Sequence, residues 1–248
     1  MSEGYSISQR LHEALAEIIS EKKPGEKLIS EPQLARQLGV SRATLREAMR
    51  TFETQGIIHR RQGSGTFVLP ASCVIETGLE VLESIETMAK RCGLQVTMGK
   101  LKIDYRPCSQ EEAAALNIPP GEVVVQYSRL MLAEGRPVAY LIDILPEGII
   151  YPQDLENSFT GSILDILLKK GSLSLVSSRC EINAVTASVE IAKSFGIQRG
   201  DVLLRFIASL YTTLGQVIDY SYSYFLPGYF RFHVVRRVGN PKISNNIT

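Results

Sequence analysis

Hydrophobic side chains recur at helical spacing in three stretches of the first 60 residues. In the first stretch they lie three or four residues apart, at Leu11, Leu15 and Ile18. Because that spacing places them on one face, it predicts a helix that begins near Ser8 and ends before Pro24. A second helix is expected to start at residues 30–33, where Ser-Glu-Pro-Gln has the form of a capping box, and to extend through Leu38.

The third stretch, over residues 42–55, has its apolar side chains on a single face, at Leu45, Ala48, Met49 and Phe52. Only a Gly-Val turn separates it from the second helix, and Ser41 can cap its first turn, so the two form a helix-turn-helix. Two short strands follow at 57–61 and 66–68, joined by Gln-Gly-Ser-Gly at 62–65. These elements together predict a winged helix.

The face of the third helix opposite its apolar stripe carries side chains that suit DNA. Guanidinium groups bind guanine edges or phosphates, and hydroxyl groups bind phosphates. The glycines of the wing allow a close backbone approach to a phosphate or to the minor groove. The candidate DNA contacts are Ser41, Arg42, Thr44, Arg46, Arg50, Gln62 and Gly63. The alternative for each arginine taken alone is an exposed surface charge.

The charge distribution indicates DNA binding only when the two parts of the chain are counted separately. The 248 residues carry 27 Lys and Arg against 26 Asp and Glu, and this net charge of +1 argues neither for nor against DNA. Residues 1–70 hold ten basic and eight acidic side chains, and residues 71–248 hold seventeen and eighteen. Within residues 36–61, six arginines outnumber two glutamates. Such a local basic stripe is typical of a nucleic-acid-binding surface.

The larger part of the chain contains an internal repeat. A shift of 79 residues places Lys-Ile-Asp at 102–104 on Glu-Ile-Asn at 181–183, and Gly-Glu-Val at 121–123 on Gly-Asp-Val at 200–202. Each copy reads as helix, strand, short helix, long strand, Gly hairpin and long strand. The pattern predicts an α+β domain whose mainly antiparallel sheet is built from both repeats, with a ligand crevice between them.

The sequence gives few signs of other chemistry. No charge-free stretch reaches the ~18 apolar residues of a membrane-spanning helix, and the N-terminus lacks the pattern of a secretory signal, so we expect a cytoplasmic protein. The four cysteines and three histidines are widely spaced, without a zinc motif or a catalytic constellation. We therefore expect no catalytic residues, no metal, no cofactor and no membrane partner.

The N-terminal part resembles the DNA-binding domain of the GntR family of bacterial transcription regulators. The resemblance covers residues 24–68, PGEKLISEPQLARQLGVSRATLREAMRTFETQGIIHRRQGSGTFV, including the Gly-Val-Ser-Arg turn and the Gln-Gly-x-Gly-Thr wing. In that family the residues at five of the candidate positions touch operator DNA. The resemblance thus implies DNA contacts by Ser41, Arg42, Thr44, Arg46 and Gly63.

Residues from about 76 to 238 resemble the UTRA effector-sensing domain of the HutC subfamily, whose fold is similar to chorismate lyase. The resemblance rests on Pro-Pro-Gly-Glu at 119–122, Tyr-Ser-Arg-Leu at 127–130 and Tyr-Phe-Arg-Phe at 229–232. It implies that a small acidic ligand, such as a sugar phosphate, binds an arginine and polar side chains of neighbouring strands. These would be Arg129, Asp143, Asp219, Ser221 and Tyr224. Alternatively, Arg129 pairs with a neighbouring carboxylate and the other side chains are structural.

We therefore expect a winged helix-turn-helix domain at 1–70, a linker at 71–77, and a UTRA domain for effector binding and dimerisation at 78–240. The leading hypothesis is a homodimeric regulator, a repressor, that binds a palindromic double-stranded DNA operator. A small acidic metabolite would release it. Two alternatives stay open: a chorismate-lyase-like enzyme with a DNA-binding domain, and a DNA-binding protein without a ligand.

Overall fold

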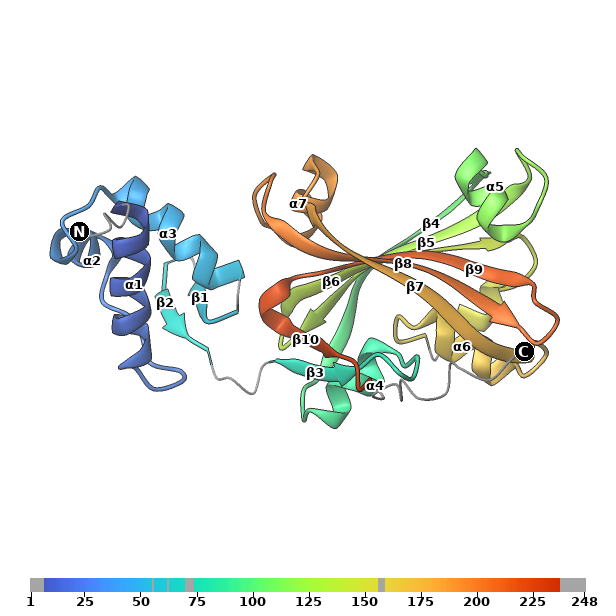
Figure 1. Cartoon of the computed structure of the whole chain (residues 1–248), viewed down its shortest axis with the longest axis horizontal. Coiled ribbons are helices and arrows are strands. Elements are labelled where there is room, and N and C mark those ends of the chain that lie inside the picture. Colours follow the sequence, from blue (N-terminus) through green and yellow to red (C-terminus); the bar gives the residue numbers. More distant parts are fainter. Residues whose placement is uncertain (1–6, 55, 62, 70–73, 156–158, 237–248) are drawn as a thin grey trace, which may run out of the picture.

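The computed structural model describes residues 7–54, 56–61, 63–69, 74–155 and 159–236. It contains a small N-terminal unit of helices and a hairpin, which lies beside a larger unit built on a twisted sheet (Figure 1). Helices and a mostly antiparallel sheet make this an α+β chain, as the sequence predicts.

The N-terminal unit is a winged helix. Its elements are α1 (Ile7–Ser20), α2 (Glu31–Gln37), α3 (Arg42–Thr54), β1 (Ile58–Arg61) and β2 (Gly65–Val68). The two strands pair antiparallel. The apolar faces of the three helices meet in one core, where Leu15, Leu34 and Leu45 are fully buried. Burial of these faces fixes the orientation of α3 against α1 and α2.

Local signals set the boundaries of these helices. Gln33 Oε1 accepts hydrogen bonds from Ser30 N at 3.3 Å and from Ser30 Oγ at 2.7 Å, as expected for the start of α2. Gly39 follows α2 with φ +65°, a conformation that glycine adopts without strain. Thr44 N then donates to Ser41 Oγ at 3.1 Å, which caps α3.

The larger unit begins and ends on a short strand pair. Its elements are β3 (Ile75–Gly78), α4 (Ile85–Arg91), β4 (Val96–Pro107), α5 (Gln110–Leu116), β5 (Val123–Ala133), β6 (Arg136–Pro146), η2 (Pro152–Leu155), α6 (Ile163–Lys170), β7 (Leu175–Thr186), α7 (Val189–Phe195), β8 (Val202–Thr212), β9 (Val217–Phe225), η3 (Pro227–Tyr229) and β10 (Phe230–His233). Strand β3 pairs parallel with β10. Residues 75–77, the last three of the expected linker at 71–77, are thus part of this strand pair.

Six strands form one antiparallel sheet in the order β4-β5-β6-β9-β8-β7. Strands β4 and β5 and helix α5 have the same lengths as β7, β8 and α7, and each lies 79 residues before its counterpart. Even the left-handed residues that end the short helices correspond, Asn117 with φ 54° and Gly196 with φ 69°. The predicted repeat is therefore a structural repeat, and its two copies meet where β6 pairs with β9.

The two faces of the sheet are covered differently. Helix α5 contacts β9, and α7 contacts β6, so each of these helices covers a central strand of the other repeat. Ile144 and Tyr220 pack with α5 on that face. Tyr127 and Leu145 point the other way and pack with α6, on the face that α4 also covers (Figure 1). Side chains between α4 and α6 therefore line a space over the centre of the sheet.

Candidate functional site

The first turns of α3 present the predicted DNA contacts to solvent. Ser41, Arg42, Thr44 and Arg46 are all exposed, because the opposite side of the helix is held in the core by Leu45 and Met49. The arginines border a hollow that lies on the side of α3 facing the larger unit. It is lined by Arg42, Ala43, Arg46, Glu47, Arg50, Arg60 and Gln198. Four guanidinium groups thus surround one surface depression.

Glu31 at the start of α2 organises two of these guanidinium groups. Arg46 Nε donates to Glu31 Oε2 at 2.7 Å, and Arg60 Nε lies 3.2 Å from Glu31 Oε1. Burial raises the pKa of Glu31, but the hydrogen bond from Arg46 and the charges of Arg60, Arg46 and Arg42 outweigh it, so the pKa is lowered. The ionised carboxylate holds Arg46 in place until a stronger partner replaces it.

Arg50 differs from the other predicted DNA contacts. Its side chain is 19% exposed, and it forms ion pairs with Glu47 of α3, at 2.8 Å, and with Asp201 of the larger unit. The backbones also meet beside this pair: a Cβ added to Gly56 would lie 2.8 Å from Gly228 O. The C-terminal half of α3 is therefore an interface with the larger unit, and in this conformation Arg50 is not free for DNA.

The wing keeps its backbone accessible. Gly63 is exposed with φ +76°, and apart from its chain neighbours no atom of the described part of the chain lies within 4 Å of a Cβ added there. Gln62, the other predicted wing contact, lies outside the described residues.

A cavity of about 400 Å³ opens on the sheet face between α4 and α6. Residues 78–88 and the start of α6 cover it. The side chains that the sheet contributes are Arg129, Leu141, Asp143, Ser178, Cys180, Ile182, Phe206, Ala208, Leu210, Asp219, Ser221, Ser223 and Phe225. They come from both repeats, as the predicted crevice requires. Alternation along β9 places Tyr224 on the opposite face, so this predicted ligand contact is not part of the cavity lining.

Arg129 is 2% exposed and already has several partners. Its Nη1 forms an ion pair with Asp143 and donates to Tyr127 O at 3.3 Å, and its Nε donates to Gly161 O. Strand register explains the pairing with Asp143, because Leu141 lies opposite Arg129 and Asp143 is two residues further along β6 on the same face. Arg129 thus pairs with a carboxylate of the protein itself, which is the alternative to ligand binding that the sequence left open. Arg129 also lines the cavity.

Two carboxyl groups of the cavity have oxygen atoms with no partner. Among the described residues, neither Asp219 Oδ1 nor Glu86 Oε1, both buried, has a hydrogen-bond partner. Burial, and then the nearby carboxylate of Asp143, raise the pKa of Asp219 well above its ordinary value. Burial also raises the pKa of Glu86. Both carboxyl groups therefore keep their protons to a higher pH than a solvent-exposed carboxyl group does.

Several lining residues could not be found from sequence motifs. Ser178 and Cys180 are revealed only by strand register, which places them on the same face as Arg129. Alternation from Ser221 could have pointed to Ser223. Glu86 had no local signal, because a charged residue in a short helix is usually a surface residue.

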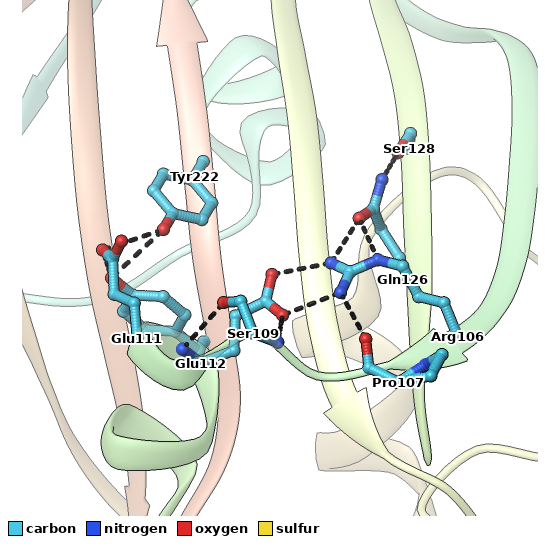
Figure 2. A network of polar contacts seen from close by, with 9 residues as sticks. Arg106, Pro107, Ser109, Glu111, Glu112, Gln126, Ser128 and Tyr222 are labelled. Carbon is cyan, nitrogen blue, oxygen red and sulfur yellow. Dashed lines mark hydrogen bonds and ion pairs between the residues drawn. The ribbon is translucent and has the colours of Figure 1, made fainter. Parts of the chain in front are cut away.

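Polar side chains on the opposite face of the sheet are paired with one another (Figure 2). Arg106 donates to both oxygens of Glu112, at 2.7 and 2.6 Å, and to Gln126. Tyr222 donates to Glu111 at 3.1 Å. These groups satisfy each other, which identifies the network as structural support for α5.

Within residues 7–236, as far as they are described, no three His, Cys, Asp or Glu side chains could hold a metal ion. None of the helices in the described ranges is long and apolar enough to cross a membrane.

Comparison with known proteins agrees with this two-part architecture. Residues 7–68 match the family "Bacterial regulatory proteins, gntR family", and residues 91–231 match the UTRA domain. The HTH-type transcriptional repressor NagR of Bacillus subtilis is 28% identical over 221 residues, which cover 88% of each chain. The mannosyl-D-glycerate transport/metabolism system repressor MngR of Escherichia coli is 26% identical, over 92% of this chain and 93% of its own.

Solved structures share the fold. The crystal structure of PhnF from Mycobacterium smegmatis is similar with a TM-score of 0.63 and 20% identity, over 92% of this chain and all of PhnF. Relatives that span both units are named as regulators or repressors, which supports a regulator rather than an enzyme. The chain belongs to the gntR family of bacterial regulatory proteins and is a transcriptional regulator with a UTRA domain.

Proposed function

We propose that this chain is a homodimeric repressor that binds a two-fold symmetric operator in the cytoplasm and is released by a small molecule in the sheet cavity. The observation that carries the proposal is the presence, in one chain, of an exposed basic helix start and a separate cavity in the larger unit. Relatives named as repressors over nearly the whole chain support the sign of regulation.

DNA recognition would use the N-terminal half of α3. In a helix-turn-helix the first turns of the second helix enter the major groove. Arg42 and Arg46 are exposed there and can reach guanine edges or phosphates, while Thr44 can reach a phosphate. Gly63 would bring the wing backbone to the adjacent groove. We expect the half-sites of a dimer to be about one helical turn apart, roughly 10 bp, or a multiple of it.

Coupling between the two functions would act through the contact of α3 with the larger unit. Arg50 can pair with Asp201 or contact DNA, and the hollow that holds Arg42 and Arg46 also faces Gln198. A ligand that favours the conformation with Arg50 paired to Asp201 would lower operator affinity by the ratio of its affinities for the two states.

Dimerisation would bury the open edges of the large sheet. Strand β7 is an edge strand of twelve residues, and its apolar side chain Val176 is exposed. A long edge with exposed apolar residues is readily covered by another chain. A second copy of this protein is the occupant that a two-fold symmetric operator requires.

The class of the effector depends on the partners of Arg129. The sequence favours an acidic metabolite that pairs with this arginine. Its buried guanidinium is already neutralised by Asp143, and Asp219 lies in the same cavity. An acidic ligand would have to compete with a carboxylate of the protein itself, which argues against it.

Selection of bound sequences from random duplex DNA by the full-length protein tests the proposal. We expect enrichment of a two-fold symmetric site, for which Arg46→Ala weakens binding by about 1–3 kcal/mol. Arg10→Ala, an exposed arginine of α1, is the matched control and should bind normally. Recovery of no common sequence, or equal binding by wild type and Arg46→Ala, would reject this placement of α3.

A further inference from the structure

We infer that the sheet cavity takes a small primary amine with an apolar or aromatic body, whose ammonium group binds the carboxyl groups of Asp219 and Glu86. This inference rests on the cavity being the effector site proposed above. Its basis is the set of polar atoms in the cavity that the protein itself leaves without partners.

Asp219 is the central observation. It is 7% exposed and lines the cavity, and its Oδ1 is buried with no hydrogen-bond partner in the described structure. A buried carboxyl oxygen without a partner costs free energy, which a hydrogen-bond donor bound in the cavity would recover. Glu86 Oε1 is in the same condition on the α4 side of the cavity. The two groups approach from different elements, the sheet and the helix that covers it.

The opposite face of the same sheet provides the comparison. There the buried carboxyl of Glu112 is fully engaged by Arg106 and by Ser109 N, at 2.8 Å (Figure 2). On that face, therefore, a buried carboxylate with a structural role has hydrogen-bond partners for both of its oxygen atoms. The unpaired oxygens of Asp219 and Glu86 are concentrated in the cavity instead.

The charge balance of the cavity favours a cation. Its described lining includes four carboxyl groups and one guanidinium group. Glu83 pairs with Arg91 at 2.7 Å, and Asp143 pairs with Arg129. The two remaining carboxyl groups, those of Asp219 and Glu86, feel the charge of Arg129, but neither forms an ion pair among these residues. An ammonium group donates three hydrogen bonds and carries the charge that both need in order to ionise.

The rest of the cavity is suited to an apolar body. Phe206, Phe225 and Phe232 form an aromatic cluster in its lining, with ring centroids 4.7 to 5.1 Å apart. Leu141 and Ile182 extend this apolar surface along the sheet. A ligand with an amine at one end and an aromatic or aliphatic group at the other satisfies both parts of the lining.

Protonation offers a specific signature. Asp219 is faced by Asp143 and Arg129, and Glu86 by Arg129 and Asp165. Burial raises the pKa of both carboxyls, and an ammonium group favours their charged form, so we expect its binding to release protons from them. Amine affinity should therefore increase as pH rises from 5 to 8, whereas the affinity of an anion should decrease.

The decisive experiment uses three probes that share a phenyl group and differ in their end group: 2-phenylethylamine, 2-phenylethanol and 3-phenylpropanoate. Each is titrated into the full-length protein by calorimetry, in two buffers of different ionisation enthalpy. We expect the amine to bind at least tenfold more tightly than the acid and to release protons. Equal or tighter binding of the acid, tightest binding of the alcohol, or no binding of the amine would overturn the inference.

Single-residue variants test which side chains bind the amine. Asp219→Asn and Glu86→Gln should each weaken amine binding at least tenfold and reduce the proton release, while Glu111→Gln, on the opposite face, should change neither. Amine binding that is unchanged in both cavity variants would overturn the inference. Selective operator binding by the ligand-free protein tests the proposed function separately, so a protein that binds its operator but prefers the acid refutes only the amine.

Discussion

The ion pair between Arg50 and Asp201 makes a quantitative prediction about operator affinity. It joins α3 to the larger unit, and its side chains are 19% and 16% exposed. A pair of this partial exposure contributes about 1 kcal/mol, which corresponds to roughly a fivefold change in an equilibrium constant. If DNA competes with Asp201 for Arg50, Asp201→Asn should raise operator affinity about fivefold.

A double-mutant cycle separates this competition from a general charge effect. Operator affinity is measured by fluorescence anisotropy, at fixed salt, for wild type, Asp201→Asn, Arg50→Ala and the double variant. The competition predicts that Asp201→Asn has little effect once Arg50 is absent. The same gain in both backgrounds would show that the removed negative charge acts on DNA directly, and would refute the reasoning.

Three further predictions separate stability from DNA binding. Ser41→Asp keeps a cap for Thr44 N, so the free energy of unfolding in urea should change by less than about 0.5 kcal/mol. Repulsion between the new carboxylate and DNA phosphates should lower operator affinity. Normal affinity would exclude a phosphate contact at this position. Gly63→Asn should preserve the fold, because Asn tolerates a positive φ. The added side chain should block the approach of the wing backbone to DNA and weaken operator binding. Unchanged binding would place the wing away from DNA. Glu112→Gln should cost about 1–3 kcal/mol of unfolding free energy at pH 7. The hydrogen bond from Arg106 lowers the pKa of Glu112, so its stabilisation is present above the ordinary value of 4.5 and lost as pH falls through the folded value. If the free energies of unfolding of wild type and Glu112→Gln differ by the same amount at pH 7 and at pH 3, this reasoning is contradicted.

Elements with local signals could be predicted from the sequence. The winged helix is specified by short-range features, such as the Ser41 cap and the left-handed Gly39, which act within four residues. The six-stranded sheet could be predicted because the 79-residue repeat appears directly in the sequence. Its two copies need only pair through their last strands to form one sheet.

Contacts between distant segments could not be predicted. Strand β3 pairs parallel with β10, more than 150 residues away, so residues 75–77 resemble a linker when only their neighbours are considered. The ion pair of Arg50 with Asp201 could not be predicted either, because Asp201 belongs to the other unit, and the DNA contact of Arg50 stays a prediction. Tyr224 was placed in the cavity by resemblance, whereas strand alternation places it on the opposite face.

The central claim is that this chain reads a specific DNA sequence through the exposed start of α3. The most direct measurement compares the affinity of the full-length protein for its selected duplex and for a scrambled duplex of equal length, at one salt concentration. The account predicts a preference of about 10³ or more, most of which disappears in the Arg42→Ala and Arg46→Ala variants. Equal affinity for the two duplexes would contradict it.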